Sequence, residues 1–524
     1  MEKWVLKRVA LCDKVLIDRK KPAKEATPMS NSIHYSEENG IPNLKKITDE
    51  LFEDPTKIAE FNYGVEGVFL NAASKYIGDV LTEIDKAFRR SEKRLMEWYI
   101  VRTDTGTKTT HIGDTTYEKT LFKNKKTGER VYLVDVYLGF EPHDRLTEDA
   151  LTEMLKEAVQ TSYRKGGESA SLFSDISKEA VKDHLHILEF PTEKENSKPG
   201  RKRKVDTLFI EADEDHIHLQ LKFRKGDMRA KKLKKEMGSA IVKLVYVHEG
   251  VERVAPKSKR HRIRNPHYFS GIYEGEQNKV LWDEVYEYIR NNYDIDSIKK
   301  IYLISDGGGW IKAGARRLHG VERVLDEFHL RKYVLKMTRH VDGIDKDGHP
   351  AMDAIIDTIK RDTKEDFLSF VDMLMMYAGE NISIQKRVTE GAEYILNNWT
   401  AAKLRLAQRD RVCGSSTEGH VSHVLSSRMS TLPLGWSKLG ADKMAHLRAF
   451  YWNHGNMLDL VRYQKTIKDM PMAAGAERDP ISAAQMIASE HLDVPDWGRY
   501  YESMQVTLGA SIRKSLSIVL NKHF

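Results

Sequence analysis

Apolar residues recur every three or four positions between about Lys57 and Val101, which is the spacing that places side chains on one face of a helix. The stripe consists of Phe69, Ala73, Tyr76, Ile77, Val80, Leu81, Ile84, Phe88, Leu95, Trp98 and Tyr99. It predicts a long amphipathic helix that Gly78 could interrupt, and such a stripe more often serves packing than ligand binding. Over residues 115–140 the period shortens to two, and two β-rich runs around a Lys/Gly turn predict a hairpin.

Three short helical patterns follow between residues 146 and 187, separated by Gly166, Gly167 and Ser177. This succession is compatible with a helix-turn-helix and equally with an ordinary helical linker domain, and no base-contacting residue can be assigned. We group residues 46–190 as a mainly helical region with a β-hairpin, which is a DNA-binding region if residues 146–187 form a helix-turn-helix. Residues 1–45 are rich in Lys, Pro, Ser and Asn and predict an N-terminal arm with little core.

Residues 191–204 form a basic linker in which Pro, Gly and Ser precede Arg201, Lys202, Arg203 and Lys204. Beyond this boundary, β-rich segments followed by alternating helices and strands predict a mixed α/β sheet within residues 205–437. The order and spacing of these elements are similar to those of an RNase H-like core. Long helical patterns at about 340–412 predict an all-helical insertion, and residues 438–524 predict a helical C-terminal region. The expected fold class is multidomain α/β plus α.

Composition limits the class of protein. A chain of 524 residues exceeds what one hydrophobic core usually supports, so two to four domains are expected. The net charge of +7 arises from 85 basic and 78 acidic residues, and this mild excess indicates a polyanionic partner only where the basic residues cluster. No apolar run approaches the ~20 residues of a membrane helix. The two cysteines, Cys12 and Cys413, lie far apart and form no zinc-type cluster, which favours a reducing, cytoplasmic compartment.

The segment YLISDGGGWIK, residues 302–312, is the first candidate site. It lacks the Gly-Lys-Ser/Thr ending of a phosphate loop, and Lys312 stands where a dinucleotide fingerprint needs its last glycine. Asp306 ends an apolar strand, where a carboxylate can point into a crevice and bind a metal ion. The alternative is an aspartate that caps the next helix, and the segment taken alone favours that alternative.

Two further acidic positions bear on this choice. Asp213 ends another β-rich run among Glu211, Glu214 and Asp215, and Glu418 lies near the start of a late helix. A solvated turn and a first-turn glutamate that favours the helix dipole are the simpler interpretations. If Asp213, Asp306 and Glu418 converge, however, their hard oxygen ligands could hold two Mg²⁺ or Mn²⁺ ions.

Four segments carry a resemblance to a known family: LFIEADEDHIHLQ, YLISDGGGWIK, VLDEFHLRKYV and CGSSTEGHVSHVLSSRMSTLPLGWSKLGADKM. Together with upstream similarity they resemble DDE transposases with an RNase H-like fold, in detail bacterial insertion-sequence transposases of the ISLre-two type, which are related to the Mutator-like superfamily. The resemblance implies that Asp213, Asp306 and Glu418 are catalytic and bind two Mg²⁺ or Mn²⁺ ions, with Asp215 as an alternative to Asp213. Asp326 and His329 match the family's Asp-x-x-His motif, which implies a supporting role.

The resemblance further implies cleavage at element ends and transfer of the freed 3′-hydroxyl into target DNA. The expected partners are double-stranded DNA, as terminal inverted repeats and target, and a second copy of the chain. Basic residues flank the acidic segments and could neutralise phosphates, although any one run alone fits a solvated loop. They are Arg201, Lys202, Arg203, Lys204, Lys231, Lys232, Lys259, Arg260, Arg262 and Arg264. Two alternatives stay open: a non-catalytic DNA-binding descendant of a transposase, and an RNase H-like nuclease that does not join strands.

Overall fold

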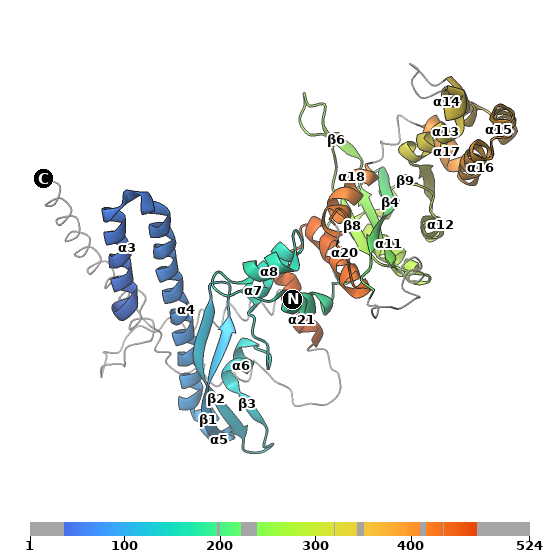
Figure 1. Ribbon diagram of the computed structural model, residues 1–524. Coiled ribbons are helices and arrows are strands. Elements are labelled where there is room, and N and C mark those ends of the chain that lie inside the picture. Colours follow the sequence, from blue (N-terminus) through green and yellow to red (C-terminus); the bar gives the residue numbers. More distant parts are fainter. Residues whose placement is uncertain are drawn as a thin grey trace, which may run out of the picture. The chain divides into compact units, whose positions relative to one another are not determined.

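The computed structural model describes residues 36–195, 200–221, 238–318, 320–342, 350–408, 416–432 and 434–468 (Figure 1). Its chain divides into two compact units. The first unit comprises residues 1–157, 164–178 and 468–524, and the second comprises residues 158–163 and 179–467. Lys231, Lys232, both cysteines, most of the expected N-terminal arm and most of the expected C-terminal region lie outside the described residues.

A helical hairpin opens the described part of the first unit. After a π-helical turn at Ser36–Gly40, α3 (Ile41–Glu53) packs against α4 (Ile58–Arg90) through a small core of Leu44, Val68 and Ala72, and a 3-10 turn at Pro55–Lys57 joins the two helices. Helix α4 runs through Gly78 without a break. A Cβ at Gly78 would lie 2.3 Å from the carbonyl oxygen of Thr116, so this glycine permits close approach of a strand rather than ending the helix.

The predicted helix is too long at its C-terminal end. Ser91 leaves the helical conformation, with φ −56° and ψ 127°, and ends α4, and after the short α5 (Glu92–Glu97) the chain enters strand β1 (Trp98–Thr109). Strand β1 pairs antiparallel with β2 (Asp114–Asn124), which pairs with the short β3 (Arg130–Tyr132) across the expected Lys/Gly turn. Helices α6 (Leu133–Leu138), α7 (Glu148–Ala158), α8 (Tyr163–Ala170) and α9 (Lys178–His186) follow.

The second unit is built on a five-stranded mixed sheet. Its strands are β4 (Thr207–His218), β5 (Ser239–His248), β8 (His267–Gly271), β9 (Lys300–Ser305) and β10 (Val321–Leu325). Their order across the sheet is β10-β9-β4-β5-β8. Strands β4, β5 and β8 pair antiparallel, whereas β4, β9 and β10 pair parallel. The mixed α/β sheet expected after the basic linker is therefore present, and the region that precedes it in the chain is mainly helical.

The two faces of this sheet pack against different helices. Leu208, Ile210 and Ala212 point into a core with residues of α11 (Gln277–Asn292) and α12 (Gly309–Ala315). Phe209, Tyr302, Ile304 and Val324 lie on the opposite face and contact Leu404 of α17 (Trp399–Ala407). Because side chains alternate along a strand, the odd-numbered positions of β4 share the face with α17.

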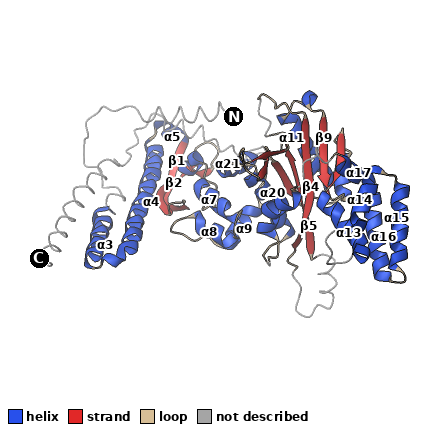
Figure 2. Ribbon diagram, turned by 90° about the horizontal axis from the view of Figure 1, so that it is seen from above, coloured by secondary structure: helices blue, strands red, loops and turns tan. Residues whose placement is uncertain are grey.

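Helices α13 (Glu327–Asp342), α14 (Pro350–Arg361), α15 (Lys364–Ala378), α16 (Ile382–Asn397) and α17 form a bundle with its own core. Figure 2 shows them gathered beside strand β9. The Thr363 and Asp366 side chains form a capping box at the start of α15, and the Asn381 side chain caps α16. The bundle covers the expected helical insertion and begins with the helix directly after β10.

The remaining elements complete the second unit. A two-stranded hairpin, β6 (Val251–Arg253) and β7 (His261–Ile263), stands between β5 and β8 in the chain, and a 3-10 turn at Ile295–Ser297 precedes β9. The later helices are α18 (Thr417–Val421), the π-helical turn Ser422–Ser426, α19 (Ser427–Met429), α20 (Lys438–Trp452) and α21 (Met457–Lys468). Among the described helices, none combines the length and apolarity needed to cross a membrane.

Candidate functional site

Three aspartates each come directly after one of three residues that lie side by side on neighbouring strands. In the parallel pairing, Ala212 of β4 lies opposite Ser305 of β9, and Ser305 lies opposite Leu325 of β10. The next residues along these strands are Asp213, Asp306 and Asp326. We call these three residues the aspartate row. Since neighbouring strands are ~4.8 Å apart, register alone brings three carboxylates side by side at the level where β9 and β10 end and β4 continues.

The aspartate row also occupies one face. Residues an even number of positions apart on a strand share a face. Asp213 is so related to Phe209, Asp306 to Ile304 and Asp326 to Val324, and these three apolar residues belong to the cluster that faces α17. Asp326 is buried, whereas Asp213 and Asp306 are half-buried. The helical bundle thus removes part of the solvent that would otherwise screen the three acids.

Burial raises the pKa of Asp213 to about 6, and the nearby charge of Asp306 adds to this rise. The backbone N–H of Glu214 donates to Asp213 Oδ1 at 2.9 Å and opposes it. Among the described residues, no donor contacts the other oxygen of Asp213. This carboxyl group is therefore partly desolvated, close to a like charge, and only half satisfied.

Asp306 is held by the glycine turn that follows it. The Gly308 N–H donates to Asp306 Oδ1 at 2.9 Å, and the Tyr394 hydroxyl donates to the Asp306 carbonyl at 2.6 Å. Gly307 has a φ of +89°, and a Cβ there would lie 2.5 Å from Asn398 Oδ1. Position 307 thus requires glycine both for its backbone and for the close approach of the bundle.

The residue at the N-cap of α12 is Gly308, and no side chain caps that helix. Asp306 uses one oxygen in a local turn, and its second oxygen contacts no donor among the described residues. Helix α12 is instead fastened through Trp310, whose Nε1 donates to Glu214 Oε2 at 2.8 Å. The turn therefore leaves half of the Asp306 carboxylate open.

Asp326 and His329 form a bonded pair at the start of α13. His329 Nδ1 lies 3.0 Å from Asp326 Oδ2, and the Phe328 N–H donates to Asp326 Oδ1 at 3.1 Å. The bond to Asp326 raises the pKa of His329, and the charges of Asp213 and Asp306 raise it further. Both oxygens of Asp326 are engaged, so this residue is suited to holding His329 in place.

Glu418 lies in the first turn of α18 with an exposed side chain. Among the described residues, none forms a hydrogen bond or an ion pair with its carboxylate. The start of its helix is nevertheless fastened to β4. Glu211 Oε2 accepts from the Ser416 N–H at 3.1 Å and from the Thr417 hydroxyl at 2.5 Å. Glu211 precedes Asp213 by two residues, so both side chains emerge on the same face.

Glu211 also belongs to this site, although no pattern in the sequence indicates a role for it. It is fully buried, and its Oε1 lies 3.1 Å from Nε2 of the equally buried His248. Burial alone would raise the pKa of Glu211, but the bonds from His248 and Thr417 outweigh burial and lower it. A buried glutamate needs such partners, yet its identity in the sequence does not distinguish it from the half-buried acids Asp213, Glu214 and Asp215 that follow it.

Asp215 occupies the same face further along β4, beyond the aspartate row. Its Oδ2 accepts from the hydroxyls of Ser426 at 3.0 Å and Ser430 at 2.8 Å. Asp215 thus ties the late helical segment to the strand, whereas Asp213 stands beside Asp306.

The basic residues expected to bind DNA fall into two groups. Arg203 donates to Glu249 at 2.7 Å and to the Tyr288 hydroxyl at 3.0 Å and stacks on Tyr293, so it serves internal packing. Lys204, Arg262 and Arg264 also face acidic partners, namely Asp294, Glu252 and Glu249. Arg201, Lys202, Lys259 and Arg260 are exposed, and no described acid pairs with them.

The carboxylate oxygens of this site are the type of ligand that a hard divalent cation prefers. Asp213 and Asp306 each keep one carboxylate oxygen without a described donor, and a cation between them would relieve the repulsion that raises the pKa of Asp213. Within the described residues, however, no three His, Cys, Asp or Glu side chains already converge on a single ion position. A third ligand would have to come from a side chain that turns inward.

Comparison with known proteins places the chain in a family. Residues 51–466 match the model of the Uncharacterised protein family (UPF0236). Two relatives from Caldanaerobacter subterraneus subsp. tengcongensis, UPF0236 proteins TTE1650/TTE2708 and TTE2489, are each 32% identical, over 86% and 82% of this chain and 86% of each relative. A solved structure, the Drosophila P element transposase strand transfer complex, aligns with 70% of this chain and 82% of that chain at 11% identity. Its TM-score of 0.22 is too low to support a conclusion. On the family model and these relatives, the chain belongs to the UPF0236 family.

Proposed function

We propose that this protein is a metal-dependent DNA transposase of an insertion sequence, with an RNase H-like catalytic domain. The observation that carries the proposal is the aspartate row, which lies where β9 and β10 end and on one face of the sheet. The sheet itself supports it: the first strand is central, antiparallel to the second and parallel to the fourth, as expected of an RNase H-like core.

In this proposal Asp213, Asp306 and Glu418 hold two Mg²⁺ or Mn²⁺ ions. Bound there, the ions would activate a water or a 3′-hydroxyl and stabilise the leaving oxygen of an in-line phosphoryl transfer. Asp213 and Asp306 are already neighbours, and each offers an open oxygen. Glu418 is exposed on a helix whose start is fastened to β4 through Glu211, so its side chain is free to turn while its backbone is held.

His329 and Asp326 have a supporting role. Asp326 uses both oxygens to hold His329 and the start of α13 in place. The raised pKa of His329 favours its protonated form, which offsets part of the negative charge of Asp213 and Asp306. The pair would therefore steady the site when DNA phosphates add further negative charge.

The β6–β7 hairpin is the best-supported DNA contact outside the acidic site. Its loop carries Lys257, Lys259 and Arg260, all exposed and without an acidic partner among the described residues. Figure 1 shows this hairpin standing out from the body of its unit near the β6 label. Unpaired cations on a projecting loop are suited to phosphate contacts, which position DNA without reading its sequence.

One feature of the relatives agrees with a mobile element. A relative that is 32% identical carries eleven TTE designations joined in one name, and another carries four. Many designations for one protein of one organism fit a gene present in many copies, as a transposable element would be. Inverted repeats flanking the gene for the present chain would support the same conclusion, and pairing two element ends would require at least a dimer.

A strand-transfer assay tests the proposal. The full chain is incubated with Mg²⁺, labelled DNA bearing the gene's flanking ends, and a plasmid target, and joined products are measured. We expect cleavage and joining by the wild type, and neither by the Asp306→Asn variant, which should still bind DNA. Cleavage without joining would favour the nuclease alternative, and binding without cleavage would favour a non-catalytic DNA-binding protein.

A further inference from the structure

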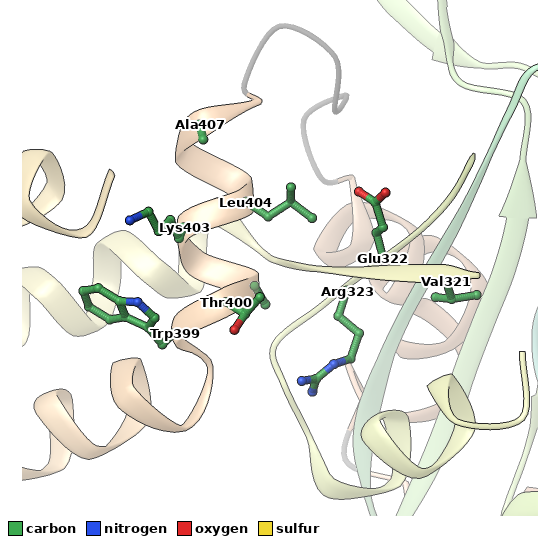
Figure 3. Close-up of a pocket in the computed structure, with 9 residues that line it drawn as sticks. Val321, Glu322, Arg323, Trp399, Thr400, Lys403, Leu404 and Ala407 are labelled. Atoms are coloured by element: carbon green, nitrogen blue, oxygen red, sulfur yellow. The ribbon is translucent and has the colours of Figure 1, made fainter. Parts of the chain in front are cut away.

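A cavity of about 570 Å³ lies between the edge strand β10 and helix α17. In Figure 3 the Leu404 side chain points from α17 toward β10, and Arg323 and Glu322 leave β10 in opposite directions. Val321, Ala401, Leu404 and Ala407 supply apolar walls, and Thr400 adds a hydroxyl. This volume lies within the roughly 300–1,000 Å³ of pockets that bind small organic groups.

The cavity contains one cation without a protein partner. Arg323 is half-buried, and no described acid or carbonyl pairs with its guanidinium. The two other charged residues of the lining, Glu322 and Lys403, already have partners. Glu322 accepts from Lys300 at 2.8 Å, and Lys403 donates to the Asp362 carbonyl at 2.9 Å. Arg323 is therefore the charge available to a ligand, and that ligand would be an anion.

A second cation connects the cavity with the aspartate row. Lys312 of α12 is half-buried, and its Nζ reaches only the Asn397 carbonyl, at 3.4 Å. Burial and the charge of Arg323 lower the pKa of Lys312, whereas the charge of Asp306 raises it. Lys312 therefore interacts electrostatically with both Arg323 and Asp306. Two nearby cations that repel each other favour a shared anion.

We infer that Lys312, Arg323 and the β10–α17 cavity bind one nucleotide of a DNA strand that enters the acidic site. The two cations take a backbone phosphate, and the cavity takes the attached nucleoside against Leu404 and Thr400. The direction of the strand follows β10, because Arg323 lies three residues before Asp326, a rise of ~10 Å. The inference rests on the proposed function, since it assigns a substrate contact to the same site.

Binding measured without metal ions tests this inference apart from catalysis. A short fluorescein-labelled oligothymidine is titrated with the full chain in EDTA, and its anisotropy is followed between about 50 and 200 mM salt. Arg323→Gln and Lys312→Gln should each weaken binding about three- to tenfold, and each should reduce the salt slope by about 0.7, as expected for one lost single-strand phosphate contact.

Lys299→Gln is the matched control. It removes the same charge just before β9, at the opposite end of that strand from Asp306, where Lys299 pairs with the exposed Asp206 at 2.7 Å. We expect its affinity and salt slope to equal those of the wild type. If Arg323→Gln and Lys312→Gln behave like this control, the inference is wrong.

Thr400→Trp tests the nucleoside position by filling the cavity. The wild type should bind oligothymidine more tightly than an abasic oligonucleotide of equal length, and Thr400→Trp should remove that difference without weakening abasic binding. An unchanged difference would overturn the cavity assignment. Because none of these measurements requires cleavage, the expected losses combined with absent strand transfer would refute the proposed transposase while leaving the nucleotide site in place.

Discussion

Asp85 is fully buried and Asp213 is half-buried, and the contrast between them shows what distinguishes a structural carboxylate from a functional one. Asp85 of α4, in the first unit, is fully buried, and both of its oxygens accept hydrogen bonds, from the Thr120 N–H at 2.8 Å and the Thr120 hydroxyl at 2.6 Å. Asp213, in the second unit, accepts one bond, from the Glu214 N–H, and lies beside Asp306. Burial raises the pKa of both groups.

The difference lies in how each site compensates the cost of burial. Thr120 satisfies Asp85 from within the protein, so that this acid fastens α4 to β2. Asp213 is left half satisfied beside a second carboxylate, which an evolved fold tolerates where a ligand completes the site. Changes to the two sites should therefore separate stability from activity.

The largest effect is expected from Asp306→Asn. The amide preserves shape and the bond from Gly308, but removes the charge that a divalent cation requires. Metal-dependent cleavage should fall by at least ~10³-fold, the range found when one essential electrostatic group is removed, while thermal stability stays within about 1 kcal/mol of the wild type. Single-turnover cleavage and thermal melting measure the two quantities. Full activity of this variant would remove Asp306 from the mechanism.

Asp85→Ala should show the opposite pattern. It leaves the N–H and the hydroxyl of the buried Thr120 without a partner, which costs about 2–3 kcal/mol in the free energy of unfolding. Cleavage per folded molecule should change less than about twofold, because Asp85 lies in the other unit. Denaturant unfolding followed by the cleavage assay below the transition provides the test. A free energy of unfolding equal to that of the wild type would show that the hydrogen bonds to Asp85 make no net contribution to stability.

Gly307→Ala should lower both stability and cleavage, each by less than the two variants above. The positive φ and the contact with Asn398 make a Cβ unfavourable by about 1–2 kcal/mol. The strained turn would displace Asp306, so cleavage should decrease more than stability does. Gly309→Ala is the matched control, because a Cβ there meets no atom within 4 Å. Equal behaviour of the two variants would show that the turn has no special requirement at residue 307.

The smallest effect concerns Asp213→Asn in the metal-free protein. Because the folded pKa of about 6 exceeds the ordinary 3.8, the ionised carboxylate disfavours the folded state, and this cost grows as pH rises from about 4 to about 6. The substitution should stabilise the protein at pH 7 by on the order of 1 kcal/mol and give no gain near pH 4. Thermal melts in EDTA at both pH values test this. Added Mg²⁺ should stabilise the wild type more than the variant, and a variant less stable than the wild type at pH 7 would contradict the assignment.

Part of this architecture could be predicted from local pattern, and the errors have physical causes. The mixed sheet and the helical bundle were predicted because long periodic segments identify their own type. The first long helix was predicted to reach Val101, yet it ends at Arg90, because Trp98 and Tyr99 fit a strand as well as a helical stripe. Gly78 was expected as an interruption, but the close approach of Thr116 explains that glycine, and such a contact leaves no local signal.

By itself the sequence determined that Asp306 ends a strand, that a glycine turn follows it, and which family this chain resembles. The expectation that Asp213 also ends its strand was wrong, because β4 continues past it to His218 and pairs with β5 over that length. Only the tertiary structure decided that Asp213 and Asp306 become neighbours with Asp326 beside them, since the pairing of Ala212 with Ser305 joins residues 93 positions apart. It also decided that Glu211 fastens α18 and that Arg203 serves packing, while Arg323 faces a cavity. The physical reason is that strand type is set by local alternation, whereas register, burial and the partner of each charge depend on residues distant in the chain.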